Sequence, residues 1–202
     1  MGRTHLAAGV AAGLAAVMPG TPADLLLCAL GGAAGGILCD VECREKKKKD
    51  DALLARAGLV LLIALAFFLD HALHLGLARY LTTEHASRSA FGGLVILLTC
   101  VRGRFSAHRT FTHSFLYAAL LAFGGWQVAP VLGKALLAGC LSHLVLDLMN
   151  KSPLRLFYPL RRGFCLGLFP ADRTANRVLG MLALGADLLL LSYCLAPMWR
   201  PA

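Results

Sequence analysis

The sequence predicts an all-α fold, a polytopic transmembrane helical bundle with about seven apolar segments, some of them short or re-entrant. Of its 202 residues, 58% are hydrophobic and only 15% are charged, and the mean hydropathy is +0.68. These values are not those of an ordinary soluble domain. Alanine, leucine and 21 glycines supply the apolar mass, as is typical where helices approach closely in lipid. No long linker divides the chain, so one domain over residues 1–202 is expected.

The apolar segments follow one another along the whole chain. They cover residues 5–18, 23–39, 53–77, 90–101, 114–133, 135–149 and 178–199. Several are shorter than the roughly 17–25 residues that a helix needs to cross a bilayer. The count of about seven therefore allows for segments that enter the membrane without crossing it.

Local signals support the first three segments. The first is interpreted as a retained helix rather than a signal peptide, because no A-x-A cleavage site precedes a soluble domain. Residues 18–22, Met-Pro-Gly-Thr-Pro, are a strong turn signal, so the first two segments are expected to form a helical hairpin. Asp70, His71 and His74 interrupt the third segment and blur its boundary with the fourth.

The fifth and sixth segments are expected to form a second hairpin, joined near Gly133-Lys134. Thr112 precedes the fifth segment and is the expected N-cap of its helix, so that His113 opens this helix. The seventh segment contains Asp187 near its middle, where a structural hydrogen bond is the preferred interpretation and a proton relay the alternative.

The basic residues predict the orientation of the bundle. If the N-terminus is cytoplasmic, seven crossings place 16 of the 20 Lys and Arg residues on the cytoplasmic side: Arg3, Arg44, Lys46, Lys47, Lys48, Lys49, Arg56, Arg102, Arg104, Arg109, Lys151, Arg155, Arg161, Arg162, Arg173 and Arg177. The remaining four, Arg79, Arg88, Lys134 and Arg200, face outward. This is the positive-inside pattern of a membrane protein. The net charge of +9 is thereby explained, the lipid bilayer is the expected partner, and no nucleic acid is expected.

The predicted topology brings five ionisable residues to the cytoplasmic face. His5 opens the first segment, Asp40 closes the second, and His113 opens the fifth. His143 and Asp147 lie one helical turn apart near the end of the sixth. Such groups are costly in a membrane, about 2.5–3.5 kcal/mol each, and are therefore functional candidates. Imidazole and carboxylate groups together bind divalent metal ions, with Zn²⁺ as the expected ion.

The neighbouring residues suggest hydrolytic chemistry. Glu42 or Asp40, if not a ligand, is the candidate proton acceptor. Arg109 is the candidate for stabilising negative charge on a phosphoryl or acyl oxygen. The candidate substrate-binding residues are His108, Arg109, Arg104 and Lys151. A site at the membrane face favours an amphipathic, anionic substrate, with phospholipid-like phosphoesters first.

Several motifs in this chain resemble those of a known family. They are HxxxG from His5, an acidic cluster near residue 40, HRTFTHS at 108–114, and SHLVLDLMN at 142–150 followed by LFYPL. In this order they resemble the bacterial inner-membrane metal-dependent hydrolases of the YdjM/YbcI type. The resemblance covers nearly the whole chain and implies a hydrolase of the bacterial inner membrane. It also implies that the site positions are His5, Asp40, His108, His113, His143 and Asp147.

This chain departs from the family in the acidic cluster. The family commonly has a PDxDH-like stretch where this chain has CDVEC at 39–43, with Glu42 in place of the second carboxylate and no following histidine. Cys39 and Cys43 flank Asp40 and are alternative soft ligands. The odd number of cysteines, seven, does not suggest a disulfide framework.

A non-enzymatic metal-binding or ion-transporting membrane protein is the alternative function. Transport requires polar groups along a path across the bilayer, and Asp70 and Asp187 would continue such a path. Hydrolysis requires them at one mouth of the bundle. The gathering of the five ionisable residues at one face favours the hydrolase.

Overall fold

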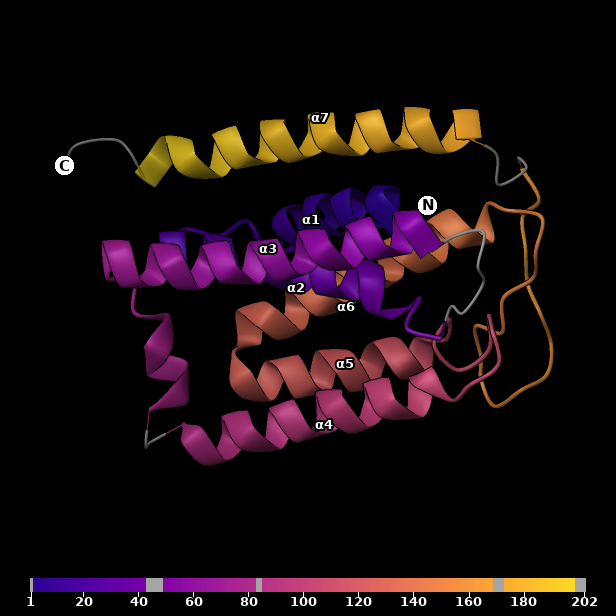
Figure 1. The fold of residues 1–202 in the computed structure, drawn as a ribbon, viewed down its shortest axis with the longest axis horizontal. Coiled ribbons are helices and arrows are strands. Elements are labelled where there is room, and N and C mark those ends of the chain that lie inside the picture. The colour runs from indigo at the N-terminus through magenta and orange to yellow at the C-terminus, as the bar shows by residue number, and fades with distance from the viewer. Residues whose placement is uncertain (1, 43–48, 83–84, 169–172, 199–202) are drawn as a thin grey trace.

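The computed structural model describes residues 2–42, 49–82, 85–168 and 173–198 and confirms the all-α fold (Figure 1). Seven α-helices and one short 3-10 helix make up the regular structure of these residues. They are α1 (Gly2–Val17), α2 (Pro22–Leu38), α3 (Lys49–Leu73), η2 (Leu77–Leu81), α4 (Ala86–Arg104), α5 (Phe115–Val128), α6 (Pro130–Leu148) and α7 (Arg173–Met198).

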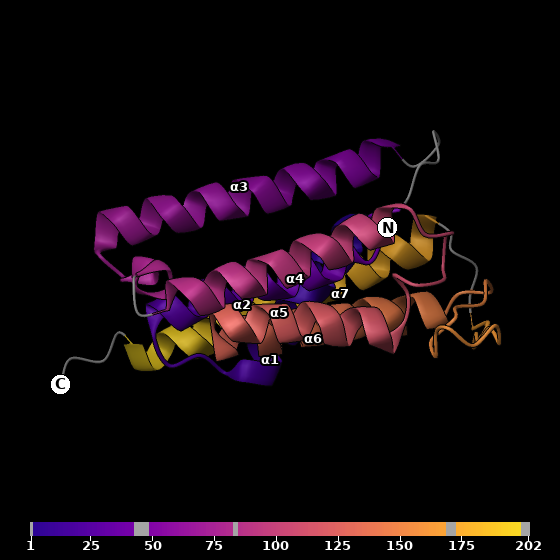
Figure 2. The ribbon, with the colours of Figure 1, turned by 90° about the horizontal axis from the view of Figure 1, so that it is seen from below.

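Consecutive α-helices run in opposite directions along the long axis of the bundle (Figure 1). Helices α1, α2 and α6 contact one another at the centre, α5 packs on α6, and α4 packs on α5. Helix α7 packs mainly on α1, whereas α3 contacts α1 and α2 and lies outside the layer formed by the other helices (Figure 2). This alternation places the end of every second helix at the same end of the bundle.

The apolar helices agree with a membrane location. Among the described residues, three helices are long and apolar enough to cross a bilayer, within Arg56–Leu73, Pro130–Leu148 and Thr174–Met198, and two shorter apolar helices cover Pro22–Leu38 and Phe115–Val128. The first and third of these spans bury few of their side chains inside the protein. Their exposed leucines and phenylalanines are therefore suited to face lipid.

The first predicted hairpin is confirmed, and the position of the second was wrong. Thr21 caps α2 by accepting a hydrogen bond from the Asp24 amide at 3.2 Å. The second turn lies at Ala129, which is extended, and Pro130 then opens α6. Proline favours the first position of a helix because its φ is preset and it needs no amide donor. The turn therefore comes before Gly133 and Lys134, which lie inside α6.

Helix α3 ends earlier than the predicted segment 53–77. Its last residue is Leu73, and His74 adopts a left-handed conformation with φ 51°. The Asp70 carboxylate accepts a hydrogen bond from the Leu77 amide at 2.7 Å. This contact holds the chain in a turn where the apolar pattern alone suggested a continuing helix.

Glycines allow the three central helices to meet at their backbones. A Cβ atom on Gly36 would collide with the carbonyl oxygen of His5, and one on Gly139 would collide with that of Gly32. Small residues are what such close crossings require. The first contact places the start of α1 directly against the end of α2, and the second joins the middle of α2 to the middle of α6.

Candidate metal centre

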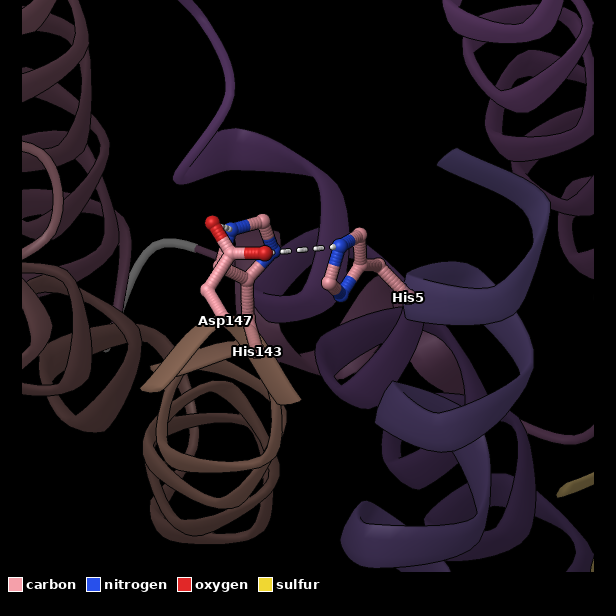
Figure 3. A group of neighbouring side chains, drawn as sticks. All are labelled: His5, His143 and Asp147. Carbon is pink, nitrogen blue, oxygen red and sulfur yellow. Dashed lines mark ion pairs between the residues drawn. The ribbon is translucent and has the colours of Figure 1, made fainter. Parts of the chain in front are cut away.

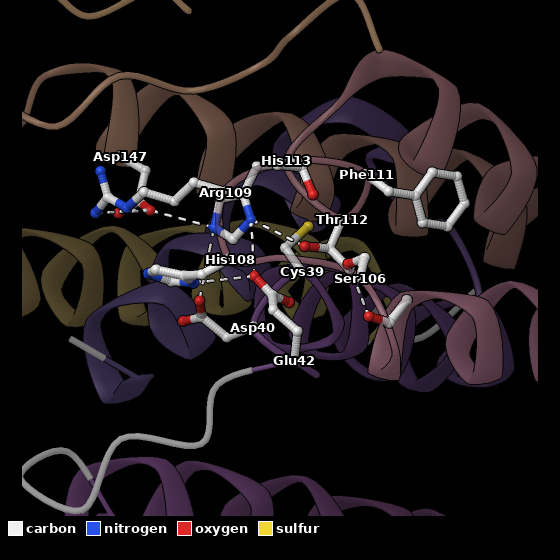
Figure 4. A network of polar contacts seen from close by, with 12 residues as sticks. Cys39, Asp40, Glu42, Ser106, His108, Arg109, Phe111, Thr112, His113 and Asp147 are labelled. Carbon is white, nitrogen blue, oxygen red and sulfur yellow. Dashed lines mark hydrogen bonds and ion pairs between the residues drawn. The ribbon is translucent and has the colours of Figure 1, made fainter. Parts of the chain in front are cut away.

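Five side chains converge at one end of the bundle, and we call them the His/Asp cluster: His5, Asp40, His113, His143 and Asp147 (Figures 3 and 4). They form two overlapping groups, His5–His143–Asp147 and Asp40–His113–His143, in each of which one ligand atom per residue lies within 4.8 Å of the others. The structure thus brings together all five residues that the sequence suggested as ligands. Their role as ligands stays a prediction.

Four chain segments supply the His/Asp cluster. His5 lies on α1, Asp40 in the turn after α2, and His143 and Asp147 on α6. His113 lies in the loop before α5, whose N-cap is Ser114: its hydroxyl accepts a hydrogen bond from the Tyr117 amide at 3.2 Å. The predicted N-cap at Thr112 was therefore wrong.

The capping residue matters for the geometry of His113. Because Ser114 adopts the extended conformation of an N-cap, the helix begins only at Phe115 and His113 precedes it. The Thr112 hydroxyl lies instead 3.0 Å from His113 Nδ1. His113 therefore belongs to the loop before α5, and its side chain is fully buried.

The backbone of α2 orients His143. This fully buried side chain has its Nδ1 atom 2.8 Å from the carbonyl oxygen of Gly36. A carbonyl only accepts hydrogen bonds, so Nδ1 carries the proton and donates it. The neutral ring then has an unprotonated Nε2 atom directed at the His/Asp cluster, which is the form that binds metal ions.

Glu42 orients His113 in a similar way. Its Oε1 atom lies 3.2 Å from His113 Nδ1, which leaves His113 Nε2 as the ligand atom. The Nε2 atoms of His113 and His143 are 3.3 Å apart. Two nitrogen lone pairs at this distance require a cation between them, either a proton or a metal ion. Two ligands of a tetrahedral Zn²⁺ ion, each at about 2.0–2.1 Å, are separated by about 3.3 Å.

Two carboxylates complete the donor set. Asp147 places Oδ2 3.3 Å from His113 Nε2 and Oδ1 3.5 Å from His5 Nε2 (Figure 3). Asp40 places Oδ1 3.6 Å from His113 Nε2 and 3.9 Å from His143 Nε2. The Asp40 side chain is 27% exposed, whereas the side chains of the other four residues are at most 5% exposed. Asp40 therefore lies where the His/Asp cluster meets solvent.

The electrostatics of the loop residues favour positive charge in the centre. Burial opposes ionisation of Glu42, yet hydrogen bonds from His108 and His113 hold the pKa of its carboxyl well below the usual range. Burial likewise opposes protonation of His113, but Asp147 and Glu42 raise its pKa to about 9. The nitrogen and oxygen donors and their net demand for positive charge fit a divalent metal ion.

Two predicted substrate-binding residues lie beside the His/Asp cluster (Figure 4). Arg109 places Nη2 3.5 Å from Asp147 Oδ2, and its Nη1 donates a hydrogen bond to the Ser152 carbonyl at 2.8 Å. His108 places Nδ1 3.1 Å from Glu42 Oε1, with 40% of its side chain exposed. Arg109 thus contacts the His/Asp cluster itself. His108 contacts Glu42, which in turn contacts His113.

The other two predicted substrate-binding residues are not brought to the centre. Arg104, the last residue of α4, and Lys151 are exposed. Within the described ranges, no ion pair or hydrogen bond joins either side chain to the His/Asp cluster. Their suggested role in substrate binding thus has no support from contacts.

Sequence reasoning missed two groups that support the centre. The Asn150 side chain is buried and donates a hydrogen bond to Asp147 Oδ1 at 3.2 Å. Its position three residues after Asp147 was a usable signal. The Gly36 carbonyl that holds His143 carries no sequence signal, because every residue has a carbonyl.

The alternative cysteine ligand does not face the centre. Cys39 is buried, and its thiol donates to the Gly35 carbonyl at 3.5 Å. This contact directs the sulfur back along α2. Cys43 lies outside the described residues.

Comparison with protein families places the chain. A family model described as YdjM inner membrane protein matches residues 1–201, a range that includes every residue of the His/Asp cluster. No curated protein and no solved structure matches the chain.

Proposed function

The chain belongs to the YdjM inner membrane protein family, and from this premise we propose that it is a metal-dependent hydrolase acting at the membrane face. The observation that carries the proposal is the pair of Nε2 atoms of His113 and His143, 3.3 Å apart. Each ring has an acceptor at Nδ1, and Asp40 and Asp147 provide carboxylate oxygens beside both Nε2 atoms. Such an arrangement suits a cation better than it suits helix packing.

The His/Asp cluster would hold a divalent ion, with Zn²⁺ first because imidazole and carboxylate are among its usual ligands. When bound, such an ion supplies the Lewis acidity that lowers the pKa of a water molecule toward neutrality. Asp40 is the carboxylate nearest to solvent and is suited to accept the proton of an incoming water.

Glu42 suits a positioning role better than that of a proton acceptor. Its carboxylate contacts Nδ1 of His113, at the end of the ring remote from the ligand atom Nε2. It also contacts His108, and its side chain is only 1% exposed. A carboxylate behind a metal-binding histidine fixes the tautomer and orientation of the ring.

Arg109 is suited to bind the anionic part of a substrate. Its guanidinium group is held between Asp147 and the Ser152 carbonyl and is 14% exposed. From this position it can neutralise charge on a phosphoryl oxygen during hydrolysis. His108, being more exposed, would line the approach to the centre.

The position of the centre suggests the substrate class. The surrounding loops carry exposed basic residues, among them Arg161 and Arg162, and exposed apolar ones, among them Phe157 and Leu160. An amphipathic, anionic molecule such as a phospholipid-like phosphoester would satisfy both kinds of side chain. The positive-inside rule assigns this end to the cytoplasm.

The alternative of ion transport receives less support. Transport needs polar groups continuing beyond the centre, and Asp70 was one of the two candidates. Its carboxylate is instead engaged by the Leu77 amide in the turn after α3. Asp187, the other candidate, is buried in α7, and its Oδ1 atom has no hydrogen-bond partner among the described residues, so the structural hydrogen bond expected there is not found. The His/Asp cluster, by contrast, gathers five ionisable side chains at one mouth of the bundle, as a hydrolase requires.

The orientation can be tested directly. Seven alternating helices and a cytoplasmic N-terminus together require the C-terminus to lie outside. A phosphatase reporter fused after Ala202 is expected to be active, and a fluorescent reporter that folds only in the cytoplasm is expected to remain dark. A bright fluorescent fusion with an inactive phosphatase fusion would contradict the proposed orientation.

Arg109→Ala tests the hydrolytic part of the proposal. It is expected to lower kcat/KM for an amphipathic phosphodiester about 100-fold, the effect of removing one donor that stabilises charge in the transition state. The bound metal, measured by elemental analysis, is expected to stay. Arg79→Ala, at the opposite end of the bundle, is the matched control. A metal-loaded protein that hydrolyses no phosphoester or acyl ester would refute the hydrolase function.

Glu42→Gln tests the positioning role. Glutamine keeps the shape of the side chain but loses the charge that holds His113 Nδ1–H. Metal affinity is expected to fall about 10- to 100-fold, as for other groups that orient a ligand. A metal titration monitored by competition with a chromophoric chelator measures the loss. If instead metal affinity is unchanged and only the pH profile of hydrolysis shifts, Glu42 is the proton acceptor.

A further inference from the structure

We propose that a groove at the end of the bundle opposite the His/Asp cluster binds an anionic phospholipid. The groove lies over α4, α5 and α6 and has a volume of about 480 Å³. Its apolar lining includes Phe123, Trp126 and Leu137, and Arg88 and Lys134 supply its charge. This site is separate from the proposed hydrolytic centre and does not depend on it.

The floor of the groove is a backbone contact between α5 and α6. A Cβ atom on Gly133 would lie 2.6 Å from the amide nitrogen of Trp126, so no side chain can fill this position. The walls rise on both sides, with Phe123, Trp126 and Leu137 exposed by 48%, 45% and 38%. The result is an apolar channel open to the side of the bundle, where an acyl chain can lie.

The charge at the groove is unusual for its end of the bundle. The positive-inside pattern assigns only four of the 20 Lys and Arg residues to the outward-facing end of the bundle. Two of these four, Arg88 and Lys134, line the groove. The Lys134 ammonium lies 5.9 Å from the centre of the Trp126 ring, and Arg88 donates a hydrogen bond to the Gln127 side chain at 3.4 Å. Among the described residues, the groove lining contains no acidic side chain.

The depth of the groove makes these charges costly without an anion. Lys134 lies within the apolar span Pro130–Leu148, where an ionised group is unfavourable unless it is paired. Arg88 and Lys134 also lie near the N-termini of α4 and α6, whose dipoles disfavour cations. The turn between α5 and α6 stops short of the ends of α3 and α7 (Figure 1). Lys134, the fifth residue of α6 after this turn, therefore lies below the level of those helix ends.

A phospholipid satisfies every part of this surface. Its phosphate would lie between Arg88 and Lys134, and one acyl chain would cover Phe123 and Leu137. Trp126 lies between the two regions, as tryptophan does at membrane interfaces. A water-soluble anion would leave the apolar walls uncovered, and a second copy of the chain would bring like charges together. An anionic headgroup adds the net charge that a zwitterionic lipid lacks.

Tryptophan fluorescence provides a direct test. The chain has two tryptophans, so Trp199→Phe leaves Trp126 as the reporter. The full-length protein is reconstituted into vesicles containing equal mole fractions of phosphatidylglycerol and phosphatidylcholine, with bromine on the acyl chains of one or the other. Brominated phosphatidylglycerol is expected to quench Trp126 more strongly than brominated phosphatidylcholine.

The preference is expected to depend on the two cations of the groove. Each cation near a lipid headgroup adds about a fivefold preference for anionic lipid. Arg88→Gln together with Lys134→Gln should therefore lower the preference about 25-fold, and Lys134→Arg should retain it. Arg79→Gln is the matched control, because this exposed cation at the same end lies outside the groove lining. Unchanged thermal unfolding of each variant shows that the fold is intact.

Three outcomes would overturn the proposal. Equal quenching by both lipids would show that the groove does not select an anionic headgroup. Full retention of the preference in the double variant would place the lipid elsewhere. An equal loss in the Arg79→Gln protein would show a general surface-charge effect rather than a site.

Discussion

His143→Ala is expected to reduce the bound metal to background in protein purified in mild detergent. His143 is shared by both ligand groups of the His/Asp cluster, and its side chain is fully buried. Losing a group that only orients a ligand lowers metal affinity about 10- to 100-fold, so losing a shared ligand should lower it by more than 100-fold. Elemental analysis of the purified protein measures the effect, and hydrolysis should be lost in parallel.

Asp147→Ala should have the same consequence, because this carboxylate contacts His5 and His113. Asp187→Asn is the matched control: Asp187 is also buried in an apolar helix but belongs to neither ligand group. Its metal content and hydrolysis are expected to stay close to those of the unaltered protein. Full metal retention by well-folded His143→Ala and Asp147→Ala proteins would reject the ligand assignment.

Gly36→Ala is expected to produce the second large effect, through packing rather than through a lost ligand. The new methyl group would collide with the His5 carbonyl oxygen and lie 3.4 Å from Gly9 Cα. Backbone atoms cannot rotate away, so α1 must move relative to α2. Overpacking of this kind costs about 1–3 kcal/mol. Thermal unfolding in detergent should therefore begin several degrees lower.

The same substitution should weaken metal binding. Moving α1 displaces His5, and moving the Gly36 carbonyl releases the hydrogen bond that orients His143. Gly93→Ala is the control, because a Cβ atom there meets no other atom within 4 Å and alanine favours the helix. A Gly36→Ala protein with unchanged unfolding temperature and metal affinity would show that α1 and α2 tolerate separation.

The helical layout was predictable because its signals are local. Apolar runs, flanking basic residues and the Pro-Gly-Thr-Pro turn all act within a few residues, and the first hairpin follows from them. The signal for the second turn was also local, because Pro130 marks the start of α6. Gly133, near which we expected the turn, instead serves the contact between α5 and α6. The early end of α3 required a side-chain contact, from Asp70 to Leu77, that composition does not reveal.

By itself the sequence determined which residues meet, since alternating helices of known direction bring His5, Asp40, His113, His143 and Asp147 to one end. Only the tertiary structure decided how they face one another. The ring of His143 is turned by a carbonyl 107 residues away and that of His113 by a carboxylate from another loop. These contacts depend on interhelical distances of a few ångströms, which close packing at glycine sets. A pattern along the chain specifies which residues share a helix face. The tautomer and orientation of a histidine ring depend instead on the group that it contacts on a neighbouring segment.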